Sequence, residues 1–292
     1  MLLKKIFFLY CIITYCILRS HEGKHEVEQP RVGNLALPCS QQPCPLLGFG
    51  QHIIDKHDTQ IFVFPDFLLG RHKNFTEVAP YVAYGITDSL ALYVELPIAA
   101  HFKSDGHCLS GPEDLITQVE YAFYTHKTAT ATDQATLVTS LLLPVGDDRK
   151  EPPTGLGSPS FFLGLTACHL STEWYCYASP GVLLTTKHDN DTKAGNGFVY
   201  QAGFGKNIAY SPDKWILAWI IELIGTYTQK RRINGIVDQN SGGNVILLGP
   251  SIWFSTERLI VQAGIAPVVY EHLFGNQLKD NVFIAFNVGW KF

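Results

Sequence analysis

The side chains of this sequence that could bind a solute are carboxyl, amide and phenol groups spaced through otherwise apolar segments. In residues 89–101, for example, Leu90, Leu92 and Val94 alternate with Tyr93 and Glu95. Because successive side chains of a β-strand point to opposite faces, such segments carry their polar groups on one face. The candidate polar face comprises Glu77, Tyr81, Tyr93, Glu95, Gln118, Glu120, Gln201, Glu222, Gln262, Asn287 and Lys291.

These faces could line a pore. In that case, four glutamates against one strand lysine favour cations at a constriction. The alternative is that Lys or Arg residues from loops neutralise the glutamates, which then only fill a narrow interior. The sequence leaves both interpretations open.

Catalysis is the competing chemistry. His169 and Ser171 lie two residues apart, as do the base and nucleophile of a twelve-stranded outer-membrane phospholipase. That chemistry needs a His that deprotonates the Ser and a third polar group that orients the His. Ser171 falls in a short predicted turn, and no suitable Asn or Asp follows on the neighbouring strand. We therefore predict that the protein is not an enzyme.

Histidine and cysteine spacing predicts no metal site and no cofactor. His52 with His57, and His101 with His107, have no spacing that fixes a coordination geometry. No cysteine pair has the Cys-x-x-Cys spacing of a zinc site. In an exported chain, two pairs could instead form disulfides across a loop and across a turn. These pairs are Cys39 with Cys44, and Cys168 with Cys176; Cys108 is left over.

The elements that must position these groups are strands. Of 292 residues, 16% are charged and 46% are apolar, and the net charge of −4 gives no reason to expect a nucleic-acid partner. From residue 59 onward, strand patterns follow one another with little helical periodicity. We expect twelve strands, at residues 59–70, 75–86, 89–101, 115–126, 134–145, 158–170, 173–186, 196–208, 215–229, 243–255, 258–270 and 281–292.

The connections between these strands predict a membrane barrel. Every second connection is short, such as Thr87-Asp88 and Ser171-Thr172, whereas most of the others run nine to thirteen residues. Short turns at one end and long loops at the other are typical of outer-membrane barrels. Tryptophans near strand ends, including Trp174, Trp253 and Trp290, suggest an aromatic girdle.

The two ends of the chain support export to the outer membrane. Lys4 and Lys5 precede an apolar run over residues 6–18, which is typical of a signal peptide spanning residues 1–20. Residues 21–58 show no sustained period and are expected to be irregular, either periplasmic or folded into the barrel mouth. Residues 59–292 are the expected barrel. The last strand carries large apolar residues at every even position and ends on Phe292, like the signal read by the barrel-assembly machinery.

Three motifs resemble the outer-membrane transporter family named for the MetA pathway of phenol degradation. They are the predicted hairpin over residues 84–97, the Leu143-Pro-Val-Gly-Asp-Asp148 loop with Gly155-Leu-Gly-Ser158, and the closing Gly-aromatic strand. The resemblance covers roughly residues 55–292. It implies an outer-membrane β-barrel with a transport role, and it supplies neither catalytic residues nor a substrate.

We thus expect an all-β, transmembrane, antiparallel up-and-down barrel of about twelve strands in a Gram-negative outer membrane. The expected function is passive passage of small solutes, which could be hydrophobic, through the lumen, with loop 146–157 narrowing the mouth. The alternative is a plugged structural or surface-interaction barrel. Expected partners are membrane lipid, lipopolysaccharide, the assembly machinery and a small solute. The basic cluster Lys230-Arg231-Arg232 could contact lipopolysaccharide phosphates, or it could simply be a solvated loop.

Overall fold

The computed structural model describes residues 29–292, except residues 52, 72, 105, 149, 151–152 and 189–190. The signal peptide expected at residues 1–20 lies outside the described residues. No helix in the described part of the chain is long and apolar enough to cross a membrane.

Almost every described element is a strand. In chain order, the strands are β1 (Thr59–Gly70), β2 (Lys73–Thr87), β3 (Leu90–Glu95), β4 (Ile98–Ser104), β5 (His107–Pro112), β6 (Leu115–Lys127), β7 (Ala131–Leu143), β8 (Ser160–Ser171), β9 (Trp174–Thr185), β10 (Gly197–Ser211), β11 (Trp215–Thr228), β12 (Arg232–Ile233), β13 (Ile236–Val237), β14 (Gly243–Thr256), β15 (Leu259–Leu273) and β16 (Asp280–Lys291).

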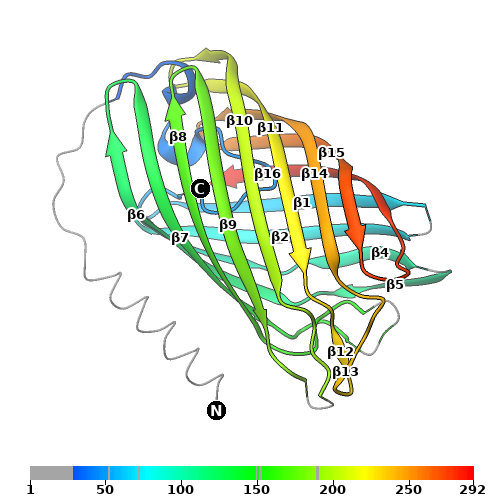
Figure 1. Ribbon diagram of the computed structural model, residues 1–292. Helices are drawn as coiled ribbons and strands as arrows, with labels where there is room; N and C mark the ends of the chain where they lie inside the picture. The colour runs from blue at the N-terminus through cyan, green and yellow to red at the C-terminus, as the bar shows by residue number, and fades with distance from the viewer. Residues whose placement is uncertain are drawn as a thin grey trace.

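One antiparallel sheet of 14 strands closes on itself, because β1 pairs with both β2 and β16 (Figure 1). Two of the wall's strands are each interrupted once: β3 and β4 form one wall strand, and β5 and β6 form the next. The barrel is therefore closed by 12 strands. This confirms the predicted twelve-stranded antiparallel barrel.

The wall is broken where β3 ends and β4 begins. Strand β2 pairs with β3 over one half of its length and with β4 over the other half. Pro97 separates β3 from β4, and a proline cannot donate to the strand ladder. Beyond this break, β4 and β5 form a hairpin. Residues 102–114 were expected to be the loop between the strands predicted at 89–101 and 115–126, and this was wrong, because much of this range lies in β4 and β5.

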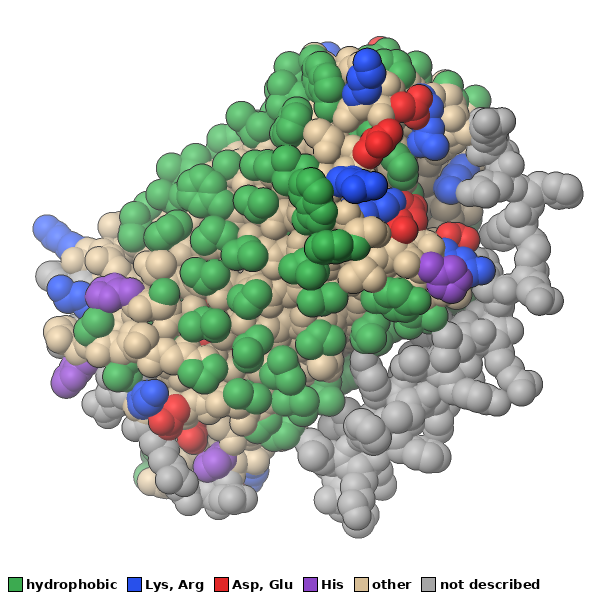
Figure 2. All heavy atoms as spheres, turned by 180° about the vertical axis from the view of Figure 1, so that it is seen from behind, with side chains coloured by type: hydrophobic (Ala, Val, Ile, Leu, Met, Phe, Trp, Pro, Cys, Tyr) green, Lys and Arg blue, Asp and Glu red, His purple; other side chains and the backbone are tan. Residues whose placement is uncertain are grey.

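The two faces of the wall differ as the alternation predicts. On the outside, apolar side chains form a broad covering of the barrel (Figure 2). Those of the last strand confirm the expected outward face, with Phe286 42%, Val288 48% and Trp290 46% exposed. Trp174 is also exposed at the outer surface. Trp253 was misplaced by the prediction, because it points inward, where only 1% of it is exposed and its Nε1 donates to Ser255 Oγ.

Residues 33–51 and 53–55 lie inside the barrel, and we call them the plug. The plug contains two short 3-10 helices, η1 (Gly33–Leu35) and η2 (Cys39–Gln41), and otherwise irregular backbone. It sits at the end of the barrel with the short connections (Figure 1). Its Leu37 and Ile54 pack in one buried cluster with wall residues such as Ile216 and Trp253. This segment was expected to lie either in the periplasm or in the barrel mouth, and the structure places it inside the barrel.

An arginine on the lipid face should test the membrane-facing assignment. Ile221 lies midway along β11, points outward and is 44% exposed. We expect Ile221→Arg to lower the free energy of unfolding by about 2–4 kcal/mol, because the charge must enter the apolar core of the bilayer. Urea unfolding of the barrel in lipid vesicles, followed by tryptophan fluorescence, measures this loss.

The matched control is Ile236→Arg, in the β12–β13 hairpin beyond the wall, where Ile236 is 75% exposed. This variant should unfold at nearly the wild-type urea concentration. Equal stability of the two variants in lipid would contradict the assigned membrane face.

Candidate functional site

Glu222 is the strongest attachment of the plug to the wall. It projects inward from β11 and is 2% exposed. Its carboxylate oxygens accept hydrogen bonds from the backbone N–H groups of Leu46 and Leu47, each at 3.0 Å. Ser251 and Tyr177 donate to the same carboxylate. The irregular plug has no strand ladder to satisfy its buried N–H groups, so the wall supplies the acceptor.

Glu120, from β6, holds the plug at a second place. Its Oε1 accepts the N–H of Gly50 at 3.0 Å and a bond from Gln118 Nε2, while Tyr93 donates to its Oε2. Gly50 has φ +77°, and an added Cβ would lie 2.6 Å from the Val138 side chain. Glycine is therefore required where the plug backbone approaches the wall.

Inward-facing amides and hydroxyls satisfy plug carbonyls. Gln201 Nε2 donates to Leu47 O at 2.9 Å, and Gln262 Nε2 donates to Cys44 O at 3.1 Å. Thr166 donates to Phe49 O in the same way. Carboxylates thus accept from the plug backbone and amides donate to it, so that both kinds of polar backbone group are matched.

Ion pairs fix the end of the plug next to β1. Lys291 Nζ, on β16, lies 2.5 Å from Asp58 Oδ2 and 3.3 Å from Asp55 Oδ2. Ser40 donates to the same oxygen of Asp55. The one lysine predicted for the lumen is therefore neutralised by residues 55 and 58, and it does not offset the four lumen glutamates.

The plug residue Cys44 has a buried thiol near the carboxylates of Glu120 and Glu222. Burial, with the negative charges of Glu222 and Glu120 nearby, raises the pKa of the Cys44 thiol well above its usual range. The thiol is 8% exposed. Cys44 therefore stays a protonated, slowly reacting thiol as long as the plug is seated.

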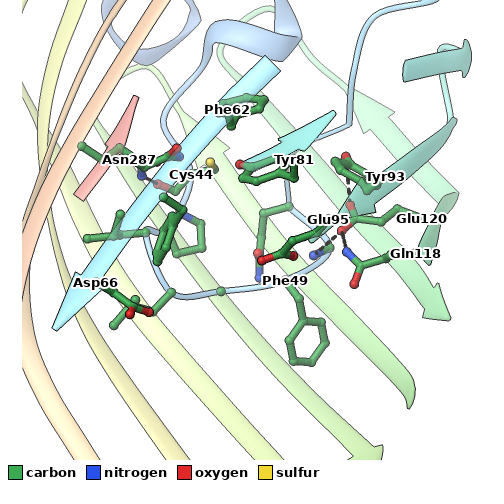
Figure 3. A pocket seen from close by; sticks show the side chains of 18 of the residues that line it. Cys44, Phe49, Phe62, Asp66, Tyr81, Tyr93, Glu95, Gln118, Glu120 and Asn287 are labelled. Carbon is green, nitrogen blue, oxygen red and sulfur yellow. Dashed lines mark hydrogen bonds between the residues drawn. The ribbon is translucent and has the colours of Figure 1, made fainter. Parts of the chain in front are cut away.

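A cavity of about 420 Å³ lies between the plug and the inner face of the wall, from β6 through β3, β2 and β1 to β16, β15 and β14 (Figure 3). Three carboxyl groups line it, from Asp66, Glu95 and Glu120. Aromatic rings form much of the remaining lining, and the rings of Phe62 and Tyr81 are stacked with centroids 4.5 Å apart. The size and mixed polarity are those of a site for a small molecule.

All of the predicted lumen residues lie on the inner face of the wall, but only some of them line the cavity. Gln201 and Glu222 hold the plug without lining the cavity, whereas Glu77 lies beside the cavity, directly opposite Asp66 in the β1–β2 register. Those that line the cavity are Tyr81, Tyr93, Glu95, Gln118, Glu120, Gln262 and Asn287.

Asp66 was missed by the sequence prediction. Its position follows from the alternation in β1, where Phe62, Phe64 and Asp66 share the inner face while Ile61 and Val63 are exposed outside. The apolar character of both faces of β1 hid this phase. Loop 146–157, expected to narrow the mouth, supplies no described residue to the cavity lining. Asp114 instead holds the loop ends by accepting the N–H groups of Gly146 and Leu156.

No disulfide joins the described cysteines. Cys168 is directly opposite Tyr177 in the β8–β9 register, and Cys176 is opposite His169. Cys168 and Tyr177 therefore point into the barrel, whereas Cys176 points outward. The expected bond between Cys168 and Cys176 is incompatible with this register, because the two Cβ atoms lie on opposite faces of the wall.

His169 and Ser171 do not form a catalytic pair. Ser171 Oγ donates to Trp174 O and accepts the N–H of Trp174, which closes the turn. His169 Nδ1 instead bonds Asp133, an acidic partner on the preceding strand that the sequence prediction overlooked. In the described part of the chain, no group of three or more His, Cys, Asp or Glu side chains could hold a metal ion. His52 is outside the described residues.

The described geometry defines a class: a twelve-stranded barrel with an apolar outer face and a plugged, polar lumen, which is the outer-membrane β-barrel. A model of the family described as "Putative MetA-pathway of phenol degradation" matches residues 54–267. The chain belongs to this family, which confirms the resemblance seen in its motifs.

The fold is similar to that of a solved outer-membrane protein. The crystal structure of an outer membrane channel from Pseudomonas putida F1 superposes with a TM-score of 0.64 at 14% identity, over 82% of this chain and 97% of that one. LpxR from Salmonella typhimurium has a TM-score of 0.43 at 9% identity, over 80% of this chain and 99% of that one. The beta domain of the Bordetella autotransporter BrkA has a TM-score of 0.42 at 10% identity, over 80% of this chain and 98% of that one. A search of curated proteins gives no match.

Removing the Glu222 carboxylate should release the plug. In Glu222→Leu, two buried backbone N–H groups lose their acceptor, a loss of about 1–3 kcal/mol for each. We expect Cys44 to react with a water-soluble maleimide at least about tenfold faster than in the wild-type protein. Peptide mapping by mass spectrometry separates Cys44 from Cys108, the exposed cysteine.

Glu257→Leu is the control, since Glu257 is an exposed residue of the β14–β15 turn at the same end of the barrel. It should leave the Cys44 rate unchanged. An unchanged rate in a folded Glu222→Leu barrel would show that the carboxylate does not retain the plug.

Proposed function

We propose that the protein is a passive channel for small solutes in the outer membrane of a Gram-negative bacterium, and that the plug gates it. The observation that carries this proposal is the cavity of about 420 Å³ between the plug and the wall. A solute entering from the end with the long loops reaches this cavity and stops at the plug. Passage to the other end requires the plug to shift.

The way the plug is held supports a gate. Its attachments at Glu120, Glu222 and Lys291 are hydrogen bonds and ion pairs, each of which can be exchanged for water when the plug moves. The solved relative from Pseudomonas putida, whose fold this chain shares, is described as an outer membrane channel. No residue arrangement in the described chain suggests catalysis, so we propose no enzymatic activity.

A second candidate is a barrel whose plug never moves and whose loops contact other molecules. The buried cluster that joins Leu37 and Ile54 to the wall favours this reading, because moving the plug would expose those side chains. The β12–β13 hairpin, with Ile236 75% exposed, is the surface such a protein would offer.

Export and assembly complete the proposal. The signal peptide at residues 1–20 directs the chain across the inner membrane. Phe292, 71% exposed at the end of the closing strand, is the residue that the assembly machinery would read. Membrane lipid covers the outer face. Lipopolysaccharide phosphates would meet Lys230 and Arg232, since Arg231 is already paired with Asp238 at 2.7 Å.

Conductance in a planar lipid bilayer tests the gate. For the mature chain, residues 21–292, we expect rare, short steps of ion current with a preference for cations. We expect Glu222→Leu to raise the fraction of time spent open at least about tenfold, because the closed state loses its attachments to the plug. Glu257→Leu is the matched control and should behave like the wild-type channel.

If every variant folds to a heat-modifiable barrel and none passes current, the gated-channel proposal fails. The static, surface-interacting barrel would then be the better description.

A further inference from the structure

The polar atoms left without partners around the cavity are acceptors. Asp66 is 8% exposed, and its Oδ1 has no hydrogen-bond partner among the described residues. Asn287, 5% exposed, has an Oδ1 in the same condition. Both side chains line the cavity (Figure 3). Buried acceptors without donors are costly, so a ligand that supplies N–H groups would relieve both.

The hydrogen-bond network fixes which atom of Asn287 faces the cavity unpaired. Gln262 Nε2 donates to the backbone oxygen of Cys44, which can only accept. Gln262 must therefore present its Oε1 to Asn287, and Asn287 donates its Nδ2 there at 2.8 Å. The Asn287 atom left over is the oxygen.

Two donors of the lining are already used, since Gln118 Nε2 and the Tyr93 hydroxyl both donate to Glu120. With three carboxyl groups and the unpaired Asn287 oxygen in its lining, the cavity is rich in acceptors, which disfavours an anion as its occupant.

Carboxyl groups gather on one side of the cavity. Asp66 and Glu95 line it, and Glu77 stands directly opposite Asp66 across the β1–β2 pair. No Lys or Arg among the described residues forms an ion pair with any of these three carboxyl groups. Neighbouring buried carboxyl groups cannot all ionise without a counter-charge.

Aromatic rings face the same space. Phe62 and Tyr81 are stacked at an interplanar angle of 9°. Phe64, Tyr93 and Trp253 also line the cavity. The faces of such rings attract a cation, and their area accommodates the apolar body of a small organic molecule.

We infer that this cavity is a binding site for a small organic cation that carries N–H donors, such as an aryl-alkyl ammonium ion. Its ammonium group lies between Asp66 and Glu95 and donates to Asp66 Oδ1, while its ring packs against Phe62 and Tyr81. A bare metal ion fits poorly, because the described residues offer no cluster of three ligands. The inference rests on the proposed function, since it names the solute class of the lumen site.

Calorimetry with three probes that share a phenyl ring tests the charge requirement. Phenethylammonium, phenethyl alcohol and phenylacetate are titrated into the full barrel in a zwitterionic detergent near neutral pH, with Trp253 fluorescence as a second signal. We expect phenethylammonium to bind at least about tenfold more tightly than phenethyl alcohol, and phenylacetate to bind least.

Two variants locate the site. Asp66→Asn and, separately, Glu95→Gln should each weaken phenethylammonium binding by about tenfold or more and leave phenethyl alcohol nearly unchanged. Glu257→Gln removes the same charge far from the cavity and should leave both affinities at the wild-type values. Two carboxyl variants are made so that the test still stands if one of them does not fold to a heat-modifiable barrel.

Equal affinities for the ammonium ion and the alcohol, no measurable binding of the ammonium ion, or insensitivity to both carboxyl variants would overturn the inference. Conductance of the same preparations separates this failure from that of the channel proposal. A conducting barrel without charge selectivity in binding refutes only the cation site, whereas a silent barrel that binds phenethylammonium through Asp66 refutes only the channel.

Discussion

The structure depends on one constraint: irregular backbone inside a barrel must find hydrogen-bond partners in the wall. The plug has neither helix nor strand over most of its length, so no regular ladder of backbone hydrogen bonds pairs its buried N–H and carbonyl groups. Glu120 and Glu222 accept from it, and Gln201 and Gln262 donate to it. Without these four side chains, ordered plug backbone in the lumen would leave buried polar groups unpaired.

The same constraint explains why charged residues are tolerated in so enclosed a lumen. A buried carboxylate is costly unless hydrogen bonds replace its water, and Glu222 receives bonds from Leu46, Leu47, Ser251 and Tyr177. Asp66 and Glu95 have no such set of donors. The acidic lumen therefore contains both structural carboxylates, which hold the plug, and carboxylates with unused capacity, which face the cavity.

The break in the wall helps to separate these two roles. Strand β3 carries Tyr93 and Glu95 as far as the break at Pro97, and the wall then continues as the β4–β5 hairpin. The carboxyl groups of the cavity come from β1, β3 and β6, near the side where the hairpin departs, whereas Glu222 holds the plug from β11, which does not line the cavity. Asp66 and Glu95, which face the cavity, thus lie on other strands than Glu222.

The sequence by itself determined the barrel. Strand alternation is local, with a period of two residues, so it places Glu77, Glu95, Glu120 and Glu222 on the inner face without knowledge of any partner strand. Alternation of short and long connections likewise fixed the antiparallel order. These are properties of neighbouring residues.

Only the tertiary structure decided what the inner face does. The plug residues that bind Glu222 are 175 and 176 residues away from it in sequence, and the plug residue that binds Gln262 is 218 away, so no local pattern predicts these contacts. The plug lacks a period because its backbone is satisfied by side chains and not by a ladder. The opposite directions of Cys168 and Cys176 follow from the β8–β9 register, which the residues between them do not reveal. The sequence could place these side chains only in the lumen. Whether each one holds the plug or lines the cavity depends on which backbone atoms lie beside it in the closed barrel.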